Sequence, residues 1–277
     1  MDRSMVRLAP PCAYQGGKQR LAGQIADRLL ATGARRFADL CCGSGAVSIE
    51  LVNRGVAPDQ IDMVDLGPWG GVWAAVGSGI FGLAAFRGHI DRIPTDPAQI
   101  QAHVQALSKQ PADDQAIYAY LVLQAAAFGS KPIWVEGGRW QNCTFRGYWL
   151  PRPDTSRQSP VNPMMPMPET LYARMAALVT GMKGVRARQA DVTTYEPEPE
   201  TAVYIDPPYV NTTRYGHAFD VATLAKSLAG KGLPVFVSEA RPLSNQATLL
   251  ASAAQRKKGG ISGVRASPNE EWLSEFR

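Results

Sequence analysis

The feature that most constrains the fold is a strand, a glycine turn, a helix and a second strand that follow one another near the N-terminus. Residues 36–42 (RFADLCC) form a short apolar run that closes on Gly43-Ser44-Gly45. Helical spacing of apolar residues resumes over 46–54, and residues 61–65 (IDMVD) indicate another buried strand that ends in an acid. Such a unit is the building block of a parallel sheet, so we expect an α/β protein.

The same alternation of strands and helices returns in the last third of the chain. The elements expected there are helices over 171–182 and 221–228 and strands over 185–191, 202–206 and 233–238. From 66 to 170 the alternation fades, although 98–107 and 113–128 have helical patterns. We therefore expect one catalytic domain made of residues 1–65 and 171–277, with residues 66–170 inserted as a helical and irregular module.

Composition excludes several classes of protein. Apolar residues make up 45% and charged residues 19% of the chain, which is enough to bury a core and excludes bulk disorder. No apolar run approaches the roughly 18 residues of a membrane span, and no apolar signal core begins the chain, so we expect a cytoplasmic protein. The four cysteines and three histidines show no metal-ligand spacing, and no metal is expected. A net charge of +5 is compatible with a nucleic-acid partner.

Two short motifs carry candidate chemistry. The Gly43-Ser44-Gly45 turn lets the backbone approach a nucleotide-like ligand, and Asp65, at the end of the next strand, suits ribose hydroxyls. Asp206-Pro207-Pro208-Tyr209 ends an apolar strand, because two prolines cannot continue a sheet ladder. It offers acceptors for an amino group and a ring for base stacking. A structural tight turn and an Asp-Pro turn with a core tyrosine are the alternatives.

Three separated motifs resemble those of the S-adenosylmethionine-dependent DNA adenine methyltransferases of bacteria and phages. They are Tyr14-Gln15-Gly16-Gly17-Lys18, Asp39–Gly45 and Asp206–Tyr209. They follow the family's order, with the cofactor loop first, then the target-recognition insertion and then the catalytic motif. Cys41-Cys42 departs from the family, which more often has proline and an aromatic residue there.

The resemblance implies a Rossmann-like methyltransferase fold, with a mixed sheet, helices on both faces and an inserted target-recognition module. It also implies an S-adenosyl-L-methionine site. The expected cofactor-binding residues are Tyr14, Lys18, Asp39, Cys41, Gly43, Ser44, Gly45, Asp65, Asp191 and Val192. Asp191 would accept from the cofactor's adenine amino group, although it could instead cap the following turn. Lys18 could instead be a surface lysine.

The implied reaction is methylation of the 6-amino group of adenine in a specific DNA sequence, by base flipping and direct in-line displacement. The expected catalytic residues are Asp206, Pro207, Pro208 and Tyr209. Asp206 and the Pro207 carbonyl would accept the amino protons, and Tyr209 would stack on the flipped base. Catalysis would then consist mostly of orientation and electrostatics.

DNA contact is expected from the insertion and from the loop after the catalytic motif. The expected DNA-binding residues are Lys131, Arg139, Trp140, Arg146, Tyr148 and Tyr215. Arginines neutralise phosphates or bind guanine edges, and aromatic rings stack on bases. Residues 139–151 could form a hairpin around Gly147. The alternative is a small aromatic core with solvated arginines.

Several points stay open from the sequence. A cytosine exocyclic-amino methyltransferase, an RNA or protein amide methyltransferase, and a catalytically silent DNA-binding relative are alternatives. Recognition sequence is not encoded in any residue pattern that we can interpret, and restriction-linked, phage-protective and regulatory roles are not distinguished. We expect a monomer acting on double-stranded DNA in a bacterial or phage-infected cell.

Overall fold

A seven-stranded mixed sheet forms the centre of the protein in a computed structural model that describes residues 7–113, 116–208, 219–252 and 270–277. The strand order is β5-β2-β1-β6-β7-β9-β8. These strands are β1 (Arg36–Leu40), β2 (Ile61–Asp65), β5 (Arg186–Gln189), β6 (Thr201–Ile205), β7 (Val235–Glu239), β8 (Gln246–Ala251) and β9 (Glu271–Phe276). The five neighbouring strands β5, β2, β1, β6 and β7 pair in parallel, whereas β9 runs antiparallel to both β7 and β8. The α/β fold expected of a Rossmann-like methyltransferase is confirmed.

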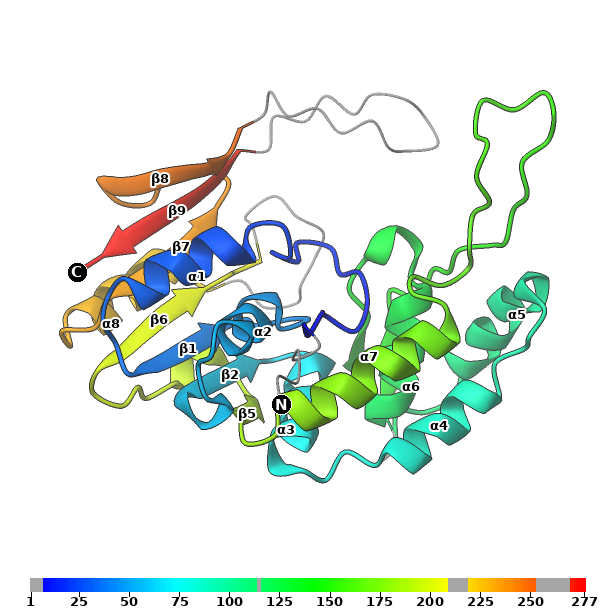
Figure 1. The fold of residues 1–277 in the computed structure, drawn as a ribbon, viewed down its shortest axis with the longest axis horizontal. Helices are drawn as coiled ribbons and strands as arrows, with labels where there is room; N and C mark the ends of the chain where they lie inside the picture. Colours follow the sequence, from blue (N-terminus) through cyan, green and yellow to red (C-terminus); the bar gives the residue numbers. More distant parts are fainter. Residues whose placement is uncertain (1–6, 114–115, 209–218, 253–269) are drawn as a thin grey trace, which may run out of the picture.

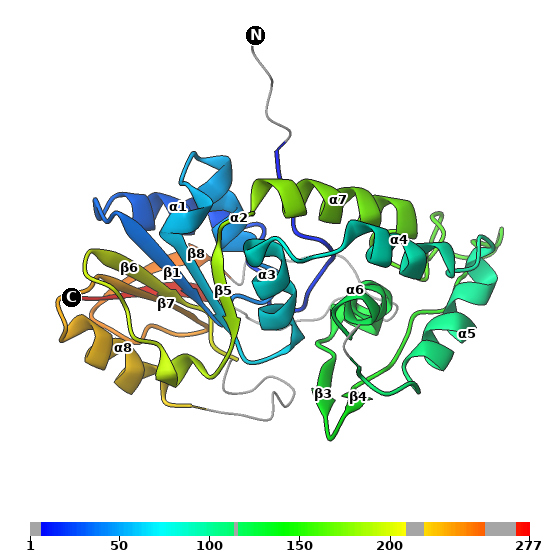
Figure 2. The same ribbon diagram turned by 90° about the horizontal axis from the view of Figure 1, so that it is seen from below.

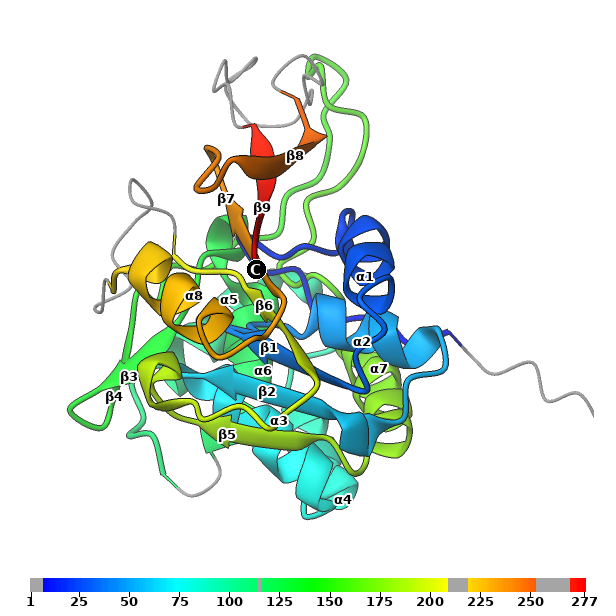
Figure 3. The ribbon, with the colours of Figure 1, turned by 90° about the vertical axis from the view of Figure 1, so that its left-hand side faces the viewer.

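Helices cover both faces of this sheet, which is why nearly all residues of its central strands are buried. Along β1, Phe37 packs in the core on one face, together with Ile25 of α1 (Ala22–Leu30). Leu40 packs in the core on the other face, together with Leu228 of α8 (Val221–Ala229). Figure 3 shows α1 and α8 on opposite sides of the strands.

The remaining helices lie mostly beside one edge of the sheet (Figure 1). Their bounds are α2 (Ala46–Asn53), α3 (Pro68–Ser78), α4 (Leu83–Asp91), α5 (Pro97–Leu107), α6 (Ala116–Ala126) and α7 (Pro168–Gly181). Short 3₁₀ turns are η1 (Pro58–Gln60), η2 (Phe128–Ser130) and η3 (Val192–Thr194). Helix α6 is apolar all round because α3, α4 and α5 pack around it. None of the helices in the described part of the chain is long and apolar enough to cross a membrane.

Helix α3 lies inside the range expected for the insertion, but it packs against β5 and β2 of the sheet. Its glycines allow this contact. A Cβ at Gly70 would lie 2.3 Å from the Asp65 carbonyl oxygen, and a Cβ at Gly77 would lie 2.0 Å from the Val185 carbonyl oxygen. Helix α3 therefore belongs to the layer that covers the sheet, and the segment that lies apart from the sheet begins after it.

A two-stranded hairpin projects from the helical part of the protein (Figure 2). Its strands are β3 (Trp134–Glu136) and β4 (Arg139–Gln141), joined by Gly137 and Gly138, both with positive φ. The prediction of a hairpin around Gly147 is wrong. Gly147 instead faces Gln101 of α5, whose amide oxygen would lie 3.1 Å from a Cβ at that position.

Candidate functional site

The ends of β1 and β6 meet at the point where the strand order reverses. Leu40 is in register with Ile205, and the Asp206 N–H donates to the Leu40 carbonyl at 3.1 Å. From β1 the chain crosses to β2 on one side, whereas β6 lies on the other side. Open α/β sheets bind their ligands in the crevice outside such a switch point. The glycine turn and Asp206 therefore occupy neighbouring positions at the edge of the sheet where such folds bind ligands.

The turn after β1 is held in a conformation that requires glycine. Gly43 has φ +49° and Gly45 has φ +74°, in the left-handed region. The indole N–H of Trp73, on α3, donates to the Gly43 carbonyl at 2.9 Å. A Cβ at Gly45 would lie 2.5 Å from the Trp73 ring. Cys41, with φ +60°, and Ser44, which is buried, complete the turn.

Asp65 closes the turn from the neighbouring strand. Its Oδ2 accepts from the Gly43 N–H at 2.8 Å, and its Oδ1 accepts from the Gly67 N–H at 2.7 Å. Burial raises the pKa of Asp65, and these two backbone donors oppose the rise. Each carboxylate oxygen has a second lone pair, so both can still accept from a ligand hydroxyl.

Asp39 lies beneath the turn instead of facing the crevice. It is only 3% exposed, and its Oδ2 accepts from the Ser48 hydroxyl at 2.7 Å and from the Ser48 N–H at 3.2 Å. Ser48 belongs to the first turn of α2. The carboxyl therefore fixes α2 against the end of β1, and the geometry favours a positioning role over direct contact with a cofactor amine.

This arrangement predicts a pH effect on stability. Burial raises the pKa of Asp39 from 3.8 to about 7, so folding disfavours its ionised form. The contribution of the protonated Asp39 carboxyl to stability is fully present below about pH 4 and is lost as the pH rises through 7. The side chain in Asp39→Asn stays neutral at every pH. We therefore expect the free energy of unfolding of this variant to rise relative to that of the wild type by a few kcal/mol between pH 4 and 8. Urea unfolding of both proteins across this pH range measures the difference. The same dependence of unfolding free energy on pH in both proteins would contradict the prediction.

The N-terminal motif, which is Tyr14-Gln15-Gly16-Gly17-Lys18, lies over the glycine turn. A Cβ at Gly43 would lie 3.1 Å from the Tyr14 ring, and Tyr14 itself meets Trp69 edge to face at 5.9 Å. A Cβ at Gly17 would lie 3.6 Å from the Ser44 hydroxyl oxygen. The motif thus reaches the turn after β1 through its own backbone and through Tyr14.

Lys18 joins this motif to the catalytic motif. Its Nζ lies 2.6 Å from Asp206 Oδ1 and 3.0 Å from the Gly16 carbonyl, and its side chain is 6% exposed. It is therefore not a surface lysine. Burial lowers the pKa of Lys18, but the attraction of Asp206 and Glu271 outweighs this and raises it. Asp206 and Lys18 form a charged pair in the crevice.

Asp206 is a perturbed acid. Burial raises its pKa from 3.8 to about 6, Lys18 opposes the rise, and Glu271 and Glu239 add to it. Pro207, which is buried, and Pro208 follow it at the strand end. A buried carboxyl with a raised pKa beside a specific charged partner is a candidate for a functional site. Tyr209 and Tyr215 lie outside the described residues.

Asp191 and Val192 lie farther along the same edge of the sheet. The Ala190 N–H donates to the Asp65 carbonyl at 3.1 Å, which brings this segment next to Asp65. Asp191 Oδ1 accepts from the Thr193 N–H and hydroxyl, both at 2.8 Å, so it caps η3, as the alternative interpretation expected. Val192 is buried in the core under α8.

The expected DNA-binding residues divide into two groups. Trp140 is buried and stacks on Tyr120 with ring centroids 6.2 Å apart, which is the aromatic core left open by the sequence. Lys131 and Arg139 are exposed, and Arg146 and Tyr148 are partly exposed. The Gln15 N–H donates to the Ser130 carbonyl at 2.8 Å, so the Lys131 segment lies against the N-terminal motif.

Sequence reasoning missed two acids in the site, Glu239 and Glu271. Glu239 ends a strand, like Asp65 and Asp206, and this position was the available signal. Glu271 begins the antiparallel strand β9, and no motif marks it.

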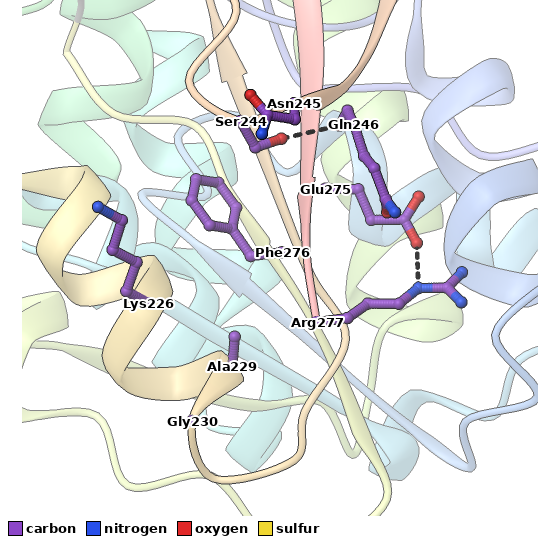
Figure 4. Close-up of a pocket in the computed structure, with 9 residues that line it drawn as sticks. All are labelled: Lys226, Ala229, Gly230, Ser244, Asn245, Gln246, Glu275, Phe276 and Arg277. Atoms are coloured by element: carbon purple, nitrogen blue, oxygen red, sulfur yellow. Dashed lines mark hydrogen bonds and ion pairs between the residues drawn. The ribbon is translucent and has the colours of Figure 1, made fainter.

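A hollow of about 450 Å³ elsewhere on the sheet is not part of this site (Figure 4). Lys226, Gln246 and Phe276 help to line it. Phe276 is in register with Val235, the first residue of β7, so the hollow lies toward the amino ends of the parallel strands. That is the opposite end from Asp206.

The mostly parallel seven-stranded sheet is consistent with the Rossmann-like fold of methyltransferases. Residues 14–63 match the family described as D12 class N6 adenine-specific DNA methyltransferase. The matched segment contains Lys18, Asp39 and the glycine turn, and ends before Asp206. No curated protein matches the chain. Over residues 14–63 the chain is similar to the adenine-specific DNA methyltransferases, and this similarity indicates a DNA methyltransferase.

Proposed function

We propose that the protein transfers the methyl group of S-adenosyl-L-methionine to the 6-amino group of an adenine in double-stranded DNA. The base would belong to a specific short sequence and would leave the duplex stack before reaction. The contact between Lys18 Nζ and Asp206 Oδ1 at 2.6 Å carries this proposal. It holds a carboxylate by one oxygen, beside the glycine turn, so that Oδ2 can receive an amino group.

The residues around the turn fit a methyl donor with a nucleoside and a positive charge. Close backbone approach at Gly17 and Gly43 leaves little room for side chains there, and Asp65 offers acceptors for ribose hydroxyls. Tyr14 provides an aromatic wall, and Asp191 lies near Asp65. Bound there, the donor would supply a methyl group made electrophilic by a positively charged sulfur.

The target base would be handled by Asp206 and the carbonyl of Pro207. Both are acceptors, and the amino group of adenine has two protons to donate. Accepting those protons turns the nitrogen lone pair away from the ring and toward an electrophile. Such preorganised acceptors act strongly in a water-poor crevice. Tyr209, the last residue of the motif, would stack on the base.

Exposed cations near the crevice would hold the DNA. Lys131 lies on the segment that contacts the N-terminal motif, and Arg139 lies on the projecting hairpin (Figure 2). Arg146 and Tyr148 follow in the same module. Phosphate contacts of this kind position DNA, and they weaken as salt increases.

Identifying the modified base tests the proposal. Purified protein, plasmid DNA and methyl-labelled S-adenosyl-L-methionine should give labelled N6-methyladenine on nucleoside analysis, confined to one short motif on sequencing. Labelled N4-methylcytosine would favour the cytosine alternative. DNA retardation without any methyl transfer would favour the catalytically silent relative and overturn the proposal.

A further inference from the structure

The C-terminal strand β9 brings a second carboxylate to Lys18. Because β9 runs antiparallel to β7, its first residues lie at the carboxyl edge of the parallel strands, where Trp272 is in register with Glu239. Glu271 precedes Trp272, and its Oε1 lies 3.5 Å from Lys18 Nζ. A parallel strand in this place would present its last residue there instead of its first.

The Lys18 ammonium has three protons to donate, and oxygens of three described residues lie within 3.5 Å of it. They belong to the Gly16 carbonyl at 3.0 Å, Asp206 at 2.6 Å and Glu271 at 3.5 Å. The side chains of Lys18, Asp206 and Glu271 are 6%, 18% and 16% exposed. A buried cation held by several acceptors has a fixed position, unlike an exposed ion pair.

We propose that Glu271 is a positioning residue for methyl transfer, which holds the Lys18 ammonium in place and shares its charge with Asp206. The inference rests on the proposed role of Asp206 as the acceptor of the base amino group. With Glu271 present, Lys18 fixes Asp206 Oδ1 without neutralising the carboxylate fully. Asp206 therefore stays a stronger acceptor than it would be in an isolated pair with Lys18.

The charges around Asp206 have a definite effect on its titration. Lys18 is the cation that faces it, and the carboxyls of Glu271, Glu239 on β7 and Asp39 on β1 surround it. Lys18 lowers the pKa of Asp206, whereas Glu271 and Glu239 raise it. Removing the Glu271 charge should therefore lower that pKa, and removing the Lys18 charge should raise it.

The test compares pH profiles of methyl transfer in Glu271→Gln, Lys18→Met and the control Glu270→Gln. Glu270 is the adjacent acid and accepts from the Trp272 indole N–H at 2.9 Å, which glutamine can also do. We expect the acid limb of kcat to move down by roughly one pH unit in Glu271→Gln and up in Lys18→Met. It should stay in place in Glu270→Gln. The plateau of kcat in Glu271→Gln should fall roughly tenfold, with KM for the methyl donor unchanged.

Two further measurements separate this inference from its alternatives. Glu271→Asp keeps the charge and should keep the wild-type acid limb. Carboxyl ¹³C NMR should show the same opposite shifts of the Asp206 pKa in the free variants, even if the protein proves to methylate something other than adenine. An unmoved titration in Glu271→Gln, or an upward shift as in Lys18→Met, would overturn the inference. Absence of N6-methyladenine with the wild type overturns only the proposed function.

Discussion

Replacing Asp206 by alanine is expected to lower the rate of methyl transfer by about 10²- to 10³-fold at neutral pH. The change removes the proposed acceptor of the amino proton and leaves the Lys18 ammonium, 6% exposed, without its 2.6 Å partner. The loss should appear in kcat, because the proposed place of the methyl donor is at the glycine turn and not at Asp206. Single-turnover transfer of labelled methyl groups to DNA measures it, and calorimetry with S-adenosylhomocysteine should show retained binding.

Asp96→Ala is the matched control for this loss. The Asp96 carboxylate accepts from the Ala98 N–H at 2.9 Å and caps α5, away from Asp206. Removing that cap costs about 1 kcal/mol of stability and should leave methyl transfer intact. If Asp206→Ala retained more than a tenth of the wild-type rate, Asp206 would not be the acceptor.

The centre of the fold was predictable because its strands are buried on both faces. β1, β2, β6 and β7 are short apolar runs that end in turn residues, and each lies where the sequence predicted a strand. The outer strands β8 and β9 were not predicted. Each has only six residues, and burial along β8 and β9 follows no regular period of two, so the sequence has no clear strand pattern there.

Helix α3 shows why local propensity can mislead. Glycine disfavours a helix, and α3 contains several glycines. The structure places Gly70 and Gly77 where the helix meets the backbone next to β5, so close packing decides their identity. The reason for these glycines lies in residues distant in sequence, and no local pattern contains it.

The site was partly predictable for the same reason. The glycine turn, Asp65 and Asp206 follow strand ends, and parallel strands bring such positions together. The Lys18–Asp206 pair joins residues 188 positions apart, and Glu271 comes from a strand that was not predicted. Contacts of this kind depend on the tertiary arrangement. The placement of Trp140 in an aromatic core likewise depends on α6, which supplies Tyr120.

Gly45→Ala is expected to destabilise the protein by about 3–4 kcal/mol and to weaken binding of S-adenosylhomocysteine at least tenfold. Part of the cost is the left-handed backbone, with φ +74°, which disfavours alanine by roughly 1–2 kcal/mol. The rest is overpacking, because the new Cβ would lie 2.5 Å from the Trp73 ring and 3.0 Å from Met63 Cε. Trp73 also donates to the Gly43 carbonyl, so moving its ring should distort the turn proposed to bind the cofactor.

Gly33→Ala separates the two causes. Gly33 has almost the same φ, +72°, and a Cβ there would meet nothing within 4 Å. This variant should therefore lose only about 1 kcal/mol, with unchanged binding of S-adenosylhomocysteine. Urea unfolding and calorimetry on both variants measure the difference, which is the steric part alone. Equal losses of stability in the two variants would mean that the Trp73 ring moves aside without a measurable free-energy cost. The close approach of the ring would then not determine the conformation of the turn.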